Sequence, residues 1–213
     1  MKNDAAKVTS ISSHPLVIDK LTKARDLSAT SESFRVLIYQ ITTMLLYEAG
    51  ASLNLKPRKI ETPLQCMEGF EIEESLAIVP ILRAGITMSD AASKLFPQAS
   101  VVHLGLKRDE NTLEAKIYFE GQLNQPGETT CILLDPMLAT GGTANAACTT
   151  LKGWGVKRII FVGIVGAPEG LSSLSKTHPD IEIYLAALDN HLNENGYIVP
   201  GLGDAGDRLF GTL

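Results

Sequence analysis

The sequence is poor in cysteine, and the few cysteines it has exclude two classes of protein. Cys66, Cys131 and Cys148 are odd in number, and they lack the spacing of zinc ligands. We therefore expect neither a disulfide framework nor a structural zinc site. The three thiols are interpreted as small core residues of a protein kept in a reducing compartment.

Long apolar runs and an excess of basic charge are also lacking. No apolar run approaches the roughly 18 residues of a membrane span, and residues 1–13 contain no apolar signal-peptide core. The formal net charge is −5, the pI is near 5.4, and no basic face rich in aromatic residues is evident. These absences predict a cytoplasmic protein that binds neither membrane nor nucleic acid. Any phosphate group must then be held by local residues.

The chain has 213 residues, of which 45% are hydrophobic, and this is enough for one large domain with a sizeable core. We predict a single domain over residues 1–213. Apolar residues at helical spacing predict helices at residues 15–26 and 31–49, with Ser31 as the N-cap of the second. The polar residues 1–13 are predicted to be a loose tail, or an arm that lies on a partner subunit.

Further along the chain, short apolar runs predict strands that are covered on both faces, at residues 76–82, 100–106, 131–135, 158–165 and 181–186. Helical segments separate several of them, at residues 85–95, 144–154 and 169–177. This alternation predicts an α/β fold with a mostly parallel central sheet flanked by helices. In such folds, ligands bind outside the carboxyl ends of the strands.

The stretch from Cys131 to Thr143, CILLDPMLATGGT, carries the clearest chemical signal. A buried strand ends at Asp135, and a Thr-Gly-Gly-Thr turn precedes the next predicted helix. Backbone N–H groups in such a turn can bind an anion at the positive end of the helix. The loop lacks the Gly-Lys-Ser/Thr ending of a Walker loop. We therefore predict that Asp135 contacts sugar hydroxyls while the turn holds a phosphate on the same sugar; an ordinary strand-to-helix turn is the alternative.

Three other segments are unusual in composition. VPILRAG, at residues 79–85, is a strand that ends in Arg83 and two small residues, which let a ligand approach the backbone. GLKRDENTL, at residues 105–113, is dense in charge and leads into a predicted hairpin or flap at residues 107–127. GYIVPGLGDAGDRLFGT, at residues 196–212, is rich in glycine and acid. Taken singly, these are also compatible with a surface arginine, a solvated loop and a frayed chain end.

Together the four segments resemble the type I phosphoribosyltransferases. DPMLATGGT, with Pro136 after the acid, is similar to the uracil phosphoribosyltransferase branch, and the resemblance covers most of the chain. It implies that uracil and 5-phosphoribosyl-1-diphosphate (PRPP) are converted to UMP and diphosphate in pyrimidine salvage. It also implies a Mg²⁺ cofactor, a flexible flap at residues 107–127, a base-binding hood at residues 187–213, and a homodimer or higher homo-oligomer. Some members of the family respond to GTP, but no segment here identifies such a site.

The same resemblance implies the site residues. Asp204, Arg108 and Asp135 are the expected catalytic residues. Contacts to PRPP are expected from Arg83, Arg108, Asp135, Pro136, Met137, Leu138, Ala139, Thr140, Gly141, Gly142, Thr143 and Asp204. Contacts to uracil are expected from Ile198, Gly203, Asp204 and Ala205, where backbone groups match the alternating acceptors and donor of the base. Asp204 is also expected to approach Mg²⁺ through a water molecule, with the ion otherwise held by PRPP.

Two residues in the C-terminal segment are given a structural role: Asp207 and Arg208 are predicted to form an ion pair. Two other functions stay open. One is a regulator that senses PRPP or a nucleotide and binds RNA or DNA, which the acidic charge disfavours. The other is a phosphoribosyltransferase for a different base, and the glycine-rich GLGDAG segment disfavours a purine.

Overall fold

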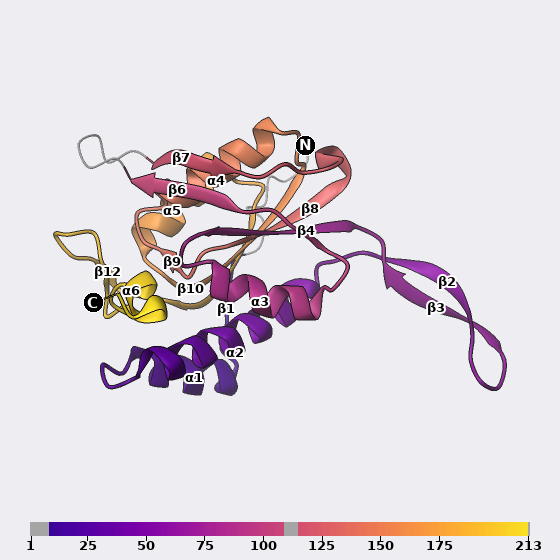
Figure 1. The fold of residues 1–213 in the computed structure, drawn as a ribbon, viewed down its shortest axis with the longest axis horizontal. Coiled ribbons are helices and arrows are strands. Elements are labelled where there is room, and N and C mark those ends of the chain that lie inside the picture. The colour runs from indigo at the N-terminus through magenta and orange to yellow at the C-terminus, as the bar shows by residue number, and fades with distance from the viewer. Residues whose placement is uncertain (1–8, 109–114, 213) are drawn as a thin grey trace, which may run out of the picture.

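The computed structural model describes residues 9–108 and 115–212, which form a twisted sheet covered by helices (Figure 1). From one edge to the other, the main strands are β1 (Thr9–Ile11), β11 (Glu182–Leu188), β10 (Arg158–Gly166), β8 (Thr129–Leu134), β4 (Ser75–Leu82), β6 (Leu104–Arg108) and β7 (Ala115–Glu120). The short strands β5 (Ser100–Val101) and β9 (Met137–Leu138) pair with β4 and β10. Only the β6–β7 pair of this described sheet is antiparallel. The predicted α/β fold with a mostly parallel sheet is confirmed.

The helices cover both faces of the sheet. One face carries α1 (Pro15–Arg25), α2 (Ser31–Gly50) and α3 (Ile86–Leu95), and the other carries α4 (Gly142–Gly153) and α5 (Pro168–Thr177). All five correspond to helices predicted from the sequence. The predicted cap of α2 is wrong, however. The Thr30 side chain accepts the N–H of Ser33 at 3.2 Å, and Ser31 is already the first helical residue.

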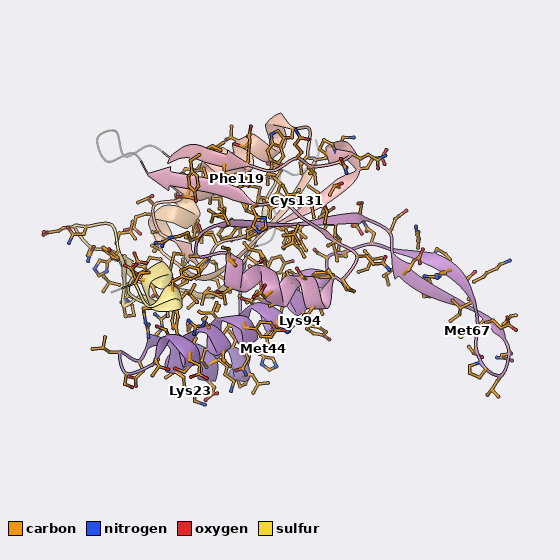
Figure 2. All side chains as sticks on the ribbon, viewed as in Figure 1. Lys23, Met44, Met67, Lys94, Phe119 and Cys131 are labelled. Atoms are coloured by element: carbon orange, nitrogen blue, oxygen red, sulfur yellow. The ribbon has the colours of Figure 1, made fainter. Side chains whose placement is uncertain are left out.

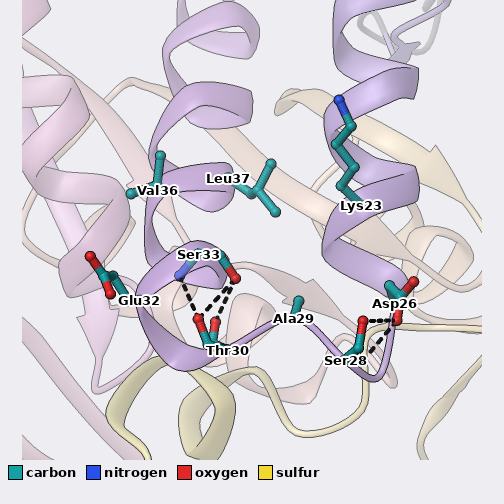
Figure 3. Close-up of a pocket in the computed structure, with 9 residues that line it drawn as sticks. All are labelled: Lys23, Asp26, Ser28, Ala29, Thr30, Glu32, Ser33, Val36 and Leu37. Carbon is teal, nitrogen blue, oxygen red and sulfur yellow. Dashed lines mark hydrogen bonds between the residues drawn. The ribbon is translucent and has the colours of Figure 1, made fainter.

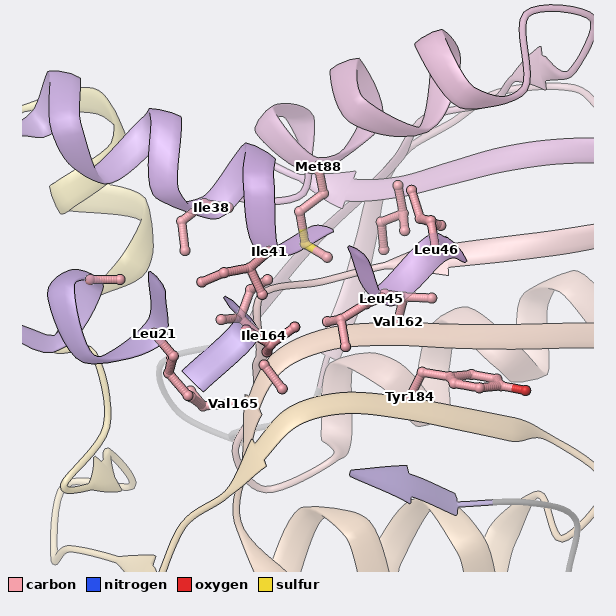
Figure 4. Packing of buried hydrophobic residues seen from close by; sticks show 14 of the residues in the cluster. Leu21, Ile38, Ile41, Leu45, Leu46, Met88, Val162, Ile164, Val165 and Tyr184 are labelled. Carbon is pink, nitrogen blue, oxygen red and sulfur yellow. The ribbon is translucent and has the colours of Figure 1, made fainter. Parts of the chain in front are cut away.

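Two buried clusters form the core, because successive strand residues point to opposite faces of the sheet. In β8, Ile132 packs in the cluster with α1, α2 and α3, whereas Cys131 and Leu133 pack in the cluster with α4 and α5. Figure 4 shows the first cluster, in which Ile41 of α2 lies near Ile164 of β10. Burial on both faces explains why these strands read as continuous apolar runs.

The predicted strand at residues 100–106 is divided into β5 and β6, whereas the other four predicted strands each correspond to one strand, namely β4, β8, β10 and β11. The predicted loose tail is wrong over its described part. β1 pairs in parallel with β11, and the Ser12 hydroxyl donates to Glu48 at 2.6 Å. The chain is therefore fixed to the sheet edge from residue 9 onward.

A long hairpin of β2 (Leu55–Glu61) and β3 (Cys66–Ile72) was not predicted. It extends from the body at the end opposite α6 (Ala205–Phe210) and β12 (His191–Leu192), and its side chains, such as Met67, point outward (Figures 1 and 2). Every residue of β2 is exposed. Because neither face of the hairpin packs on the core, its sequence lacks the alternation that marks a half-buried strand.

The segment predicted as a flap is partly described. β7 pairs with β6 in antiparallel register, and the short helix η1 (Pro126–Glu128) leads into β8. Residues 109–114 lie outside the described residues, and the flexibility of the flap stays a prediction. No helix in the described ranges is long and apolar enough to cross a membrane.

Candidate functional site

The parallel sheet brings three of the predicted segments to one edge. β4 pairs in parallel with β8 on one side and with β6 on the other. Arg83 follows β4, Asp135 follows β8 and Arg108 ends β6, so all three residues lie where the strands reach their carboxyl ends. The side chain of Arg108 lies outside the described part of the structure, and its role stays a prediction.

Arg83 is exposed at this edge and reaches the C-terminal segment. The centre of its guanidinium lies 5.8 Å from the centroid of the Phe210 ring in α6. A contact of this kind is a weak cation–π interaction at an exposed site. The predicted diphosphate-binding arginine and the predicted base-binding segment are thus neighbours, although more than 100 residues separate them in the chain.

Asp135 is the most perturbed acid of the edge. Its carboxylate accepts the backbone N–H of Met137 at 3.3 Å, and no ion pair to another described residue accompanies it. Burial raises the pKa of Asp135 to about 7, against the weaker opposing effect of the Met137 hydrogen bond. A carboxylate without a cationic partner, still partly open to solvent, can accept hydrogen bonds from the hydroxyls of a ligand.

The residues just after Asp135 are fastened to β10. The Pro136 carbonyl accepts two backbone N–H groups of β10 at 3.1 Å each, and Met137 and Leu138 form β9 beside the same strand. The Leu138 side chain is 1% exposed and packs in the core. A ligand contact from Leu138 would therefore come from its backbone.

The glycine turn opens directly onto a helix, as predicted. Gly141 has φ of +81° and is the N-cap of α4, whose first turn carries no acidic residue and no side-chain cap. The first N–H groups of a helix have no intrahelical partners, and the helix dipole favours an anion there. The Gly142 N–H donates to the Thr140 hydroxyl at 3.4 Å. This turn therefore has the form of a phosphate site.

A second helix, α5, lies directly behind this turn. The helix was predicted from the sequence, but its contact with the turn was not. A Cβ atom on Gly170 of α5 would lie 2.3 Å from the carbonyl oxygen of Ala139 and 2.7 Å from that of Leu138. The Asn145 amide also donates to the Ser173 hydroxyl at 2.9 Å, which joins α4 to α5. The shape of the turn therefore depends on a residue without a side chain in α5, and the glycine after Pro-Glu at the start of that helix was the available signal.

The predicted base-binding segment folds back over the same edge. β12 pairs with β13 (Ile198–Val199), and the N–H of Asp189 donates to the Gly166 carbonyl at the end of β10 at 2.7 Å. Ile198 is buried, and Ala205 begins α6. Asp204 is exposed and caps α6 by accepting the N–H of Asp207 at 2.9 Å.

Arginines attach this segment to the N-terminal helices. Arg208 donates to the carbonyls of Ala24, Asp26 and Leu202, and its guanidinium lies 4.1 Å from the centroid of the Phe34 ring. The predicted ion pair between Asp207 and Arg208 is therefore wrong. Backbone carbonyls near the C-terminal end of α1 outcompete the neighbouring acid because they face the guanidinium from across the fold. Arg25 and Asp189, also missed from the sequence, form a second attachment.

Two pockets of about 540 Å³ each lie away from this edge. One lies between α1 and α2 and is lined by residues from Lys23 to Leu37 (Figure 3). The other lies at the base of the β2–β3 hairpin, between residues 71–76 and 95–99. No predicted site residue lines either pocket. The candidate site is instead an open edge where several loops meet. Within the described ranges, no group of three or more His, Cys, Asp or Glu residues is arranged to hold a metal.

Comparisons with known proteins place this chain among named relatives. The sequence profile of uracil phosphoribosyltransferase matches residues 11–212. The chain is 52% identical over 202 residues to a uracil phosphoribosyltransferase of Roseiflexus castenholzii, covering 95% of this chain and 97% of the relative. It is 48% identical over 199 residues to a uracil phosphoribosyltransferase of Mesoplasma florum, covering 93% and 96%.

Two solved structures have a fold similar to that of this chain. A protein of Aquifex aeolicus superposes with a TM-score of 0.90 at 36% identity, covering 94% of this chain and 97% of that one. A hypoxanthine phosphoribosyltransferase of Staphylococcus aureus superposes with a TM-score of 0.51 at 16% identity, covering 80% of each chain. The second likeness concerns the fold alone.

The close approach of α5 to the turn predicts the effect of one methyl group. Gly170→Ala should lower the free energy of unfolding by about 1–3 kcal/mol, because backbone atoms must move to admit the methyl. In the matched helical control Gly153→Ala, nothing lies within 4 Å of the added Cβ, so the change should be neutral or stabilise by up to about 1 kcal/mol. Urea denaturation of both variants checks this. Equal effects would show that α5 does not press on the turn.

The raised pKa of Asp135 predicts a pH-dependent stability. Between the unfolded value of 3.8 and about 7, the folded protein binds the proton more tightly, so ionisation of Asp135 costs stability as pH rises through this window. Asp135→Asn should therefore raise the melting temperature by several degrees at about pH 8 and by much less at about pH 5. Thermal melts at both pH values measure the difference. A gain that is the same at both pH values would contradict the assigned pKa.

Proposed function

Because the chain belongs to the uracil phosphoribosyltransferase family, we propose that the carboxyl edge of its sheet is where it uses uracil and PRPP. The reaction is the transfer of the phosphoribosyl group to uracil, which gives UMP and diphosphate in pyrimidine salvage. The observation that carries the location is the convergence of the glycine turn before α4, the arginine after β4 and the C-terminal segment at one edge.

The turn of residues 139–143 binds the 5-phosphate of PRPP. The first turn of α4 has N–H groups without intrahelical partners, and α5 supports the turn from behind. Asp135, on the strand side of the turn, accepts hydrogen bonds from the ribose hydroxyls. Among the described residues no cation pairs with Asp135, so its oxygen atoms are available to hydroxyl groups of a ligand.

The leaving diphosphate is bound by Arg83 and Arg108. The reaction needs no protein nucleophile, because diphosphate is already a leaving group and the ribosyl carbon becomes cation-like as the bond to it breaks. Catalysis is then mainly positioning of the two substrates and stabilisation of the charge that grows on the diphosphate. An exposed arginine at the edge is free to make bidentate contacts with its oxygens.

Phosphoribosyltransferases generally use Mg²⁺ with PRPP, and the acids of the site fit this ion. Asp135 and Asp204 offer hard oxygen donors but too few for an all-protein cage, and Mg²⁺ typically takes one or two carboxylates together with phosphates and waters. Asp204 would help to hold the ion through its carboxylate oxygen atoms. When bound, Mg²⁺ supplies positive charge to the diphosphate.

Uracil is held by backbone groups of Ile198, Gly203 and Ala205. The turn between Ile198 and Ala205 is rich in glycine, so its peptide groups can approach the edge of the base without intervening side chains. Asp204 is exposed and lies between Gly203 and Ala205, beside the proposed contacts to the base. A location in the cytoplasm is supported by three free cysteines, two of them buried.

The protein also forms a homodimer or a larger homo-oligomer. The β2–β3 hairpin supports this, because Leu64 and Phe70 are 94% and 66% exposed. A two-stranded hairpin is only marginally stable alone, and several large apolar side chains of this one are exposed, as expected of a surface that is covered in an assembly. A second copy of the chain is the partner that the family resemblance implies.

The activity is tested by incubating the protein with PRPP, Mg²⁺ and labelled uracil. UMP should form, and Asp204→Asn should lower kcat by about 100-fold or more, a loss typical of removing a polar group that acts in the transition state. Asparagine can still cap α6, so a fall in kcat would result from the lost charge and not from a destabilised helix. Asp90→Asn, an exposed acid on α3, is the control and should be silent. Absence of UMP with the wild-type protein would refute the function, and a silent Asp204→Asn would refute the role of Asp204.

The oligomer is tested by sedimentation velocity. Phe70→Glu places a charge on the exposed face of the hairpin and should shift the protein toward the monomer, because a buried unpaired charge is costly. Leu27→Glu is the control, since Leu27 is 97% exposed and lies away from the hairpin. An unchanged sedimentation coefficient for Phe70→Glu would contradict the assigned interface.

A further inference from the structure

A buried ion pair lies beneath the base-binding segment. The Arg25 guanidinium, at the end of α1, donates to both carboxylate oxygens of Asp189 at 2.6 and 2.8 Å. The Asp189 side chain is 5% exposed and that of Arg25 is 24% exposed. The geometry is a bidentate contact, which fixes the relative orientation of the two groups as well as their distance.

The same pair binds both backbone groups of one residue in the turn. Asp189 accepts the N–H of Gly201 at 2.8 Å, and Arg25 donates to the Gly201 carbonyl at 2.8 Å. Gly201 has φ of +64°, and a Cβ there would lie 2.1 Å from the Ile198 carbonyl oxygen. The turn is therefore tight, and the ion pair fixes it from behind in one orientation.

This anchor links the turn to the part of the sheet that carries the phosphate loop. The Asp189 N–H donates to the carbonyl of Gly166 in β10, and Gly166 lies opposite Leu138 in β9. Through α1, Arg25 connects the same point to the helical layer. The Arg25–Asp189 pair thus connects α1, the end of β10 and the turn that contains Gly201. Ile198 and Gly203 lie on either side of Gly201 in this turn.

We propose that Arg25 and Asp189 are positioning residues for uracil: by binding Gly201 from behind, they place the backbone groups of Ile198 and Gly203 that contact the base. The inference rests on the proposed function. Neither side chain touches uracil, and neither takes part in the transfer step. A misplacement of about 1 Å at a reacting centre can cost on the order of 100-fold in rate, so a rigid support has a kinetic value beyond fold stability.

A comparable ion-pair network elsewhere in the protein provides a matched control. Arg158 donates to Glu74 at 2.6 Å, to Glu182 at 3.1 Å and to the Ser52 carbonyl at 2.7 Å. It lies at the first residue of β10, whereas the site lies at the carboxyl end of that strand. Its side chain is 20% exposed, similar to Arg25. Loss of either arginine removes a cationic partner from a buried carboxylate and should destabilise the fold.

The test compares Arg25→Gln with Arg158→Gln in steady-state kinetics, well below both melting temperatures. Arg25→Gln should raise KM for uracil by about tenfold or more while KM for PRPP stays within about twofold, because only the base-binding turn is displaced. Arg158→Gln should lower the melting temperature and leave both KM values near those of the wild type. Arg25→Lys keeps the charge but not the bidentate contact, and it should raise KM for uracil by a smaller factor than Arg25→Gln does.

The outcomes separate this inference from the function on which it rests. If the wild-type protein forms no UMP, the proposed function fails and the inference fails with it. If the wild type is active, an Arg25→Gln variant with unchanged KM for uracil would overturn the positioning role alone. So would equal increases in both KM values, or the same kinetic change in Arg158→Gln. If Arg25→Gln does not fold, KM for uracil and KM for PRPP are measured in Arg25→Lys and Asp189→Asn instead, and both variants are compared with Arg158→Gln.

Discussion

The buried contact of Arg25 with Asp189 and Gly201 is the constraint on which the C-terminal half of the site depends. The segment that follows β11 has two-residue strands and a six-residue helix, and such short elements are not stable by themselves. It is kept in place by arginine contacts with the N-terminal helices: Arg25 through the ion pair, Arg208 through three backbone carbonyls, and Arg35 through the Leu209 carbonyl. The first helices of the chain therefore act as the support for its last residues.

The other half of the site follows from the sheet. Burial on both faces aligns the parallel strands, and their carboxyl ends bring Arg83, Asp135 and the glycine turn to one edge. Two features of this edge work against stability. Asp135 is held in surroundings that raise its pKa, and the first turn of α4 carries no acidic residue to complement the helix dipole. Such locally unfavourable features are typical of functional sites.

The sequence predicted the features that arise locally. Apolar runs indicated the central strands, helical spacing indicated the helices, and the glycines after Asp135 indicated the turn that leads into α4. The features it missed are those in which distant residues meet. Arg25 and Asp189 are 164 positions apart, and the contact of Gly170 with the Ala139 carbonyl joins two segments that lie on opposite sides of α4 in the sequence. The β2–β3 hairpin was not predicted, because both its faces are exposed. Strand β1 was not predicted either, because it joins the sheet through backbone pairing with β11 and its sequence is largely polar.

Hydrogen exchange at the base-binding turn tests the central claim most directly. Amide exchange of residues 198–205 is compared in the wild-type protein and in Arg25→Gln, with the core strands β8 and β10 as the internal reference. If Arg25 and Asp189 hold the turn, the Gly201 amide is protected in the wild type, and the variant loses protection at the turn but not in the core, because local opening needs less free energy than global unfolding. Unchanged exchange at Gly201, or an equal loss of protection in β8 and β10, would contradict the account.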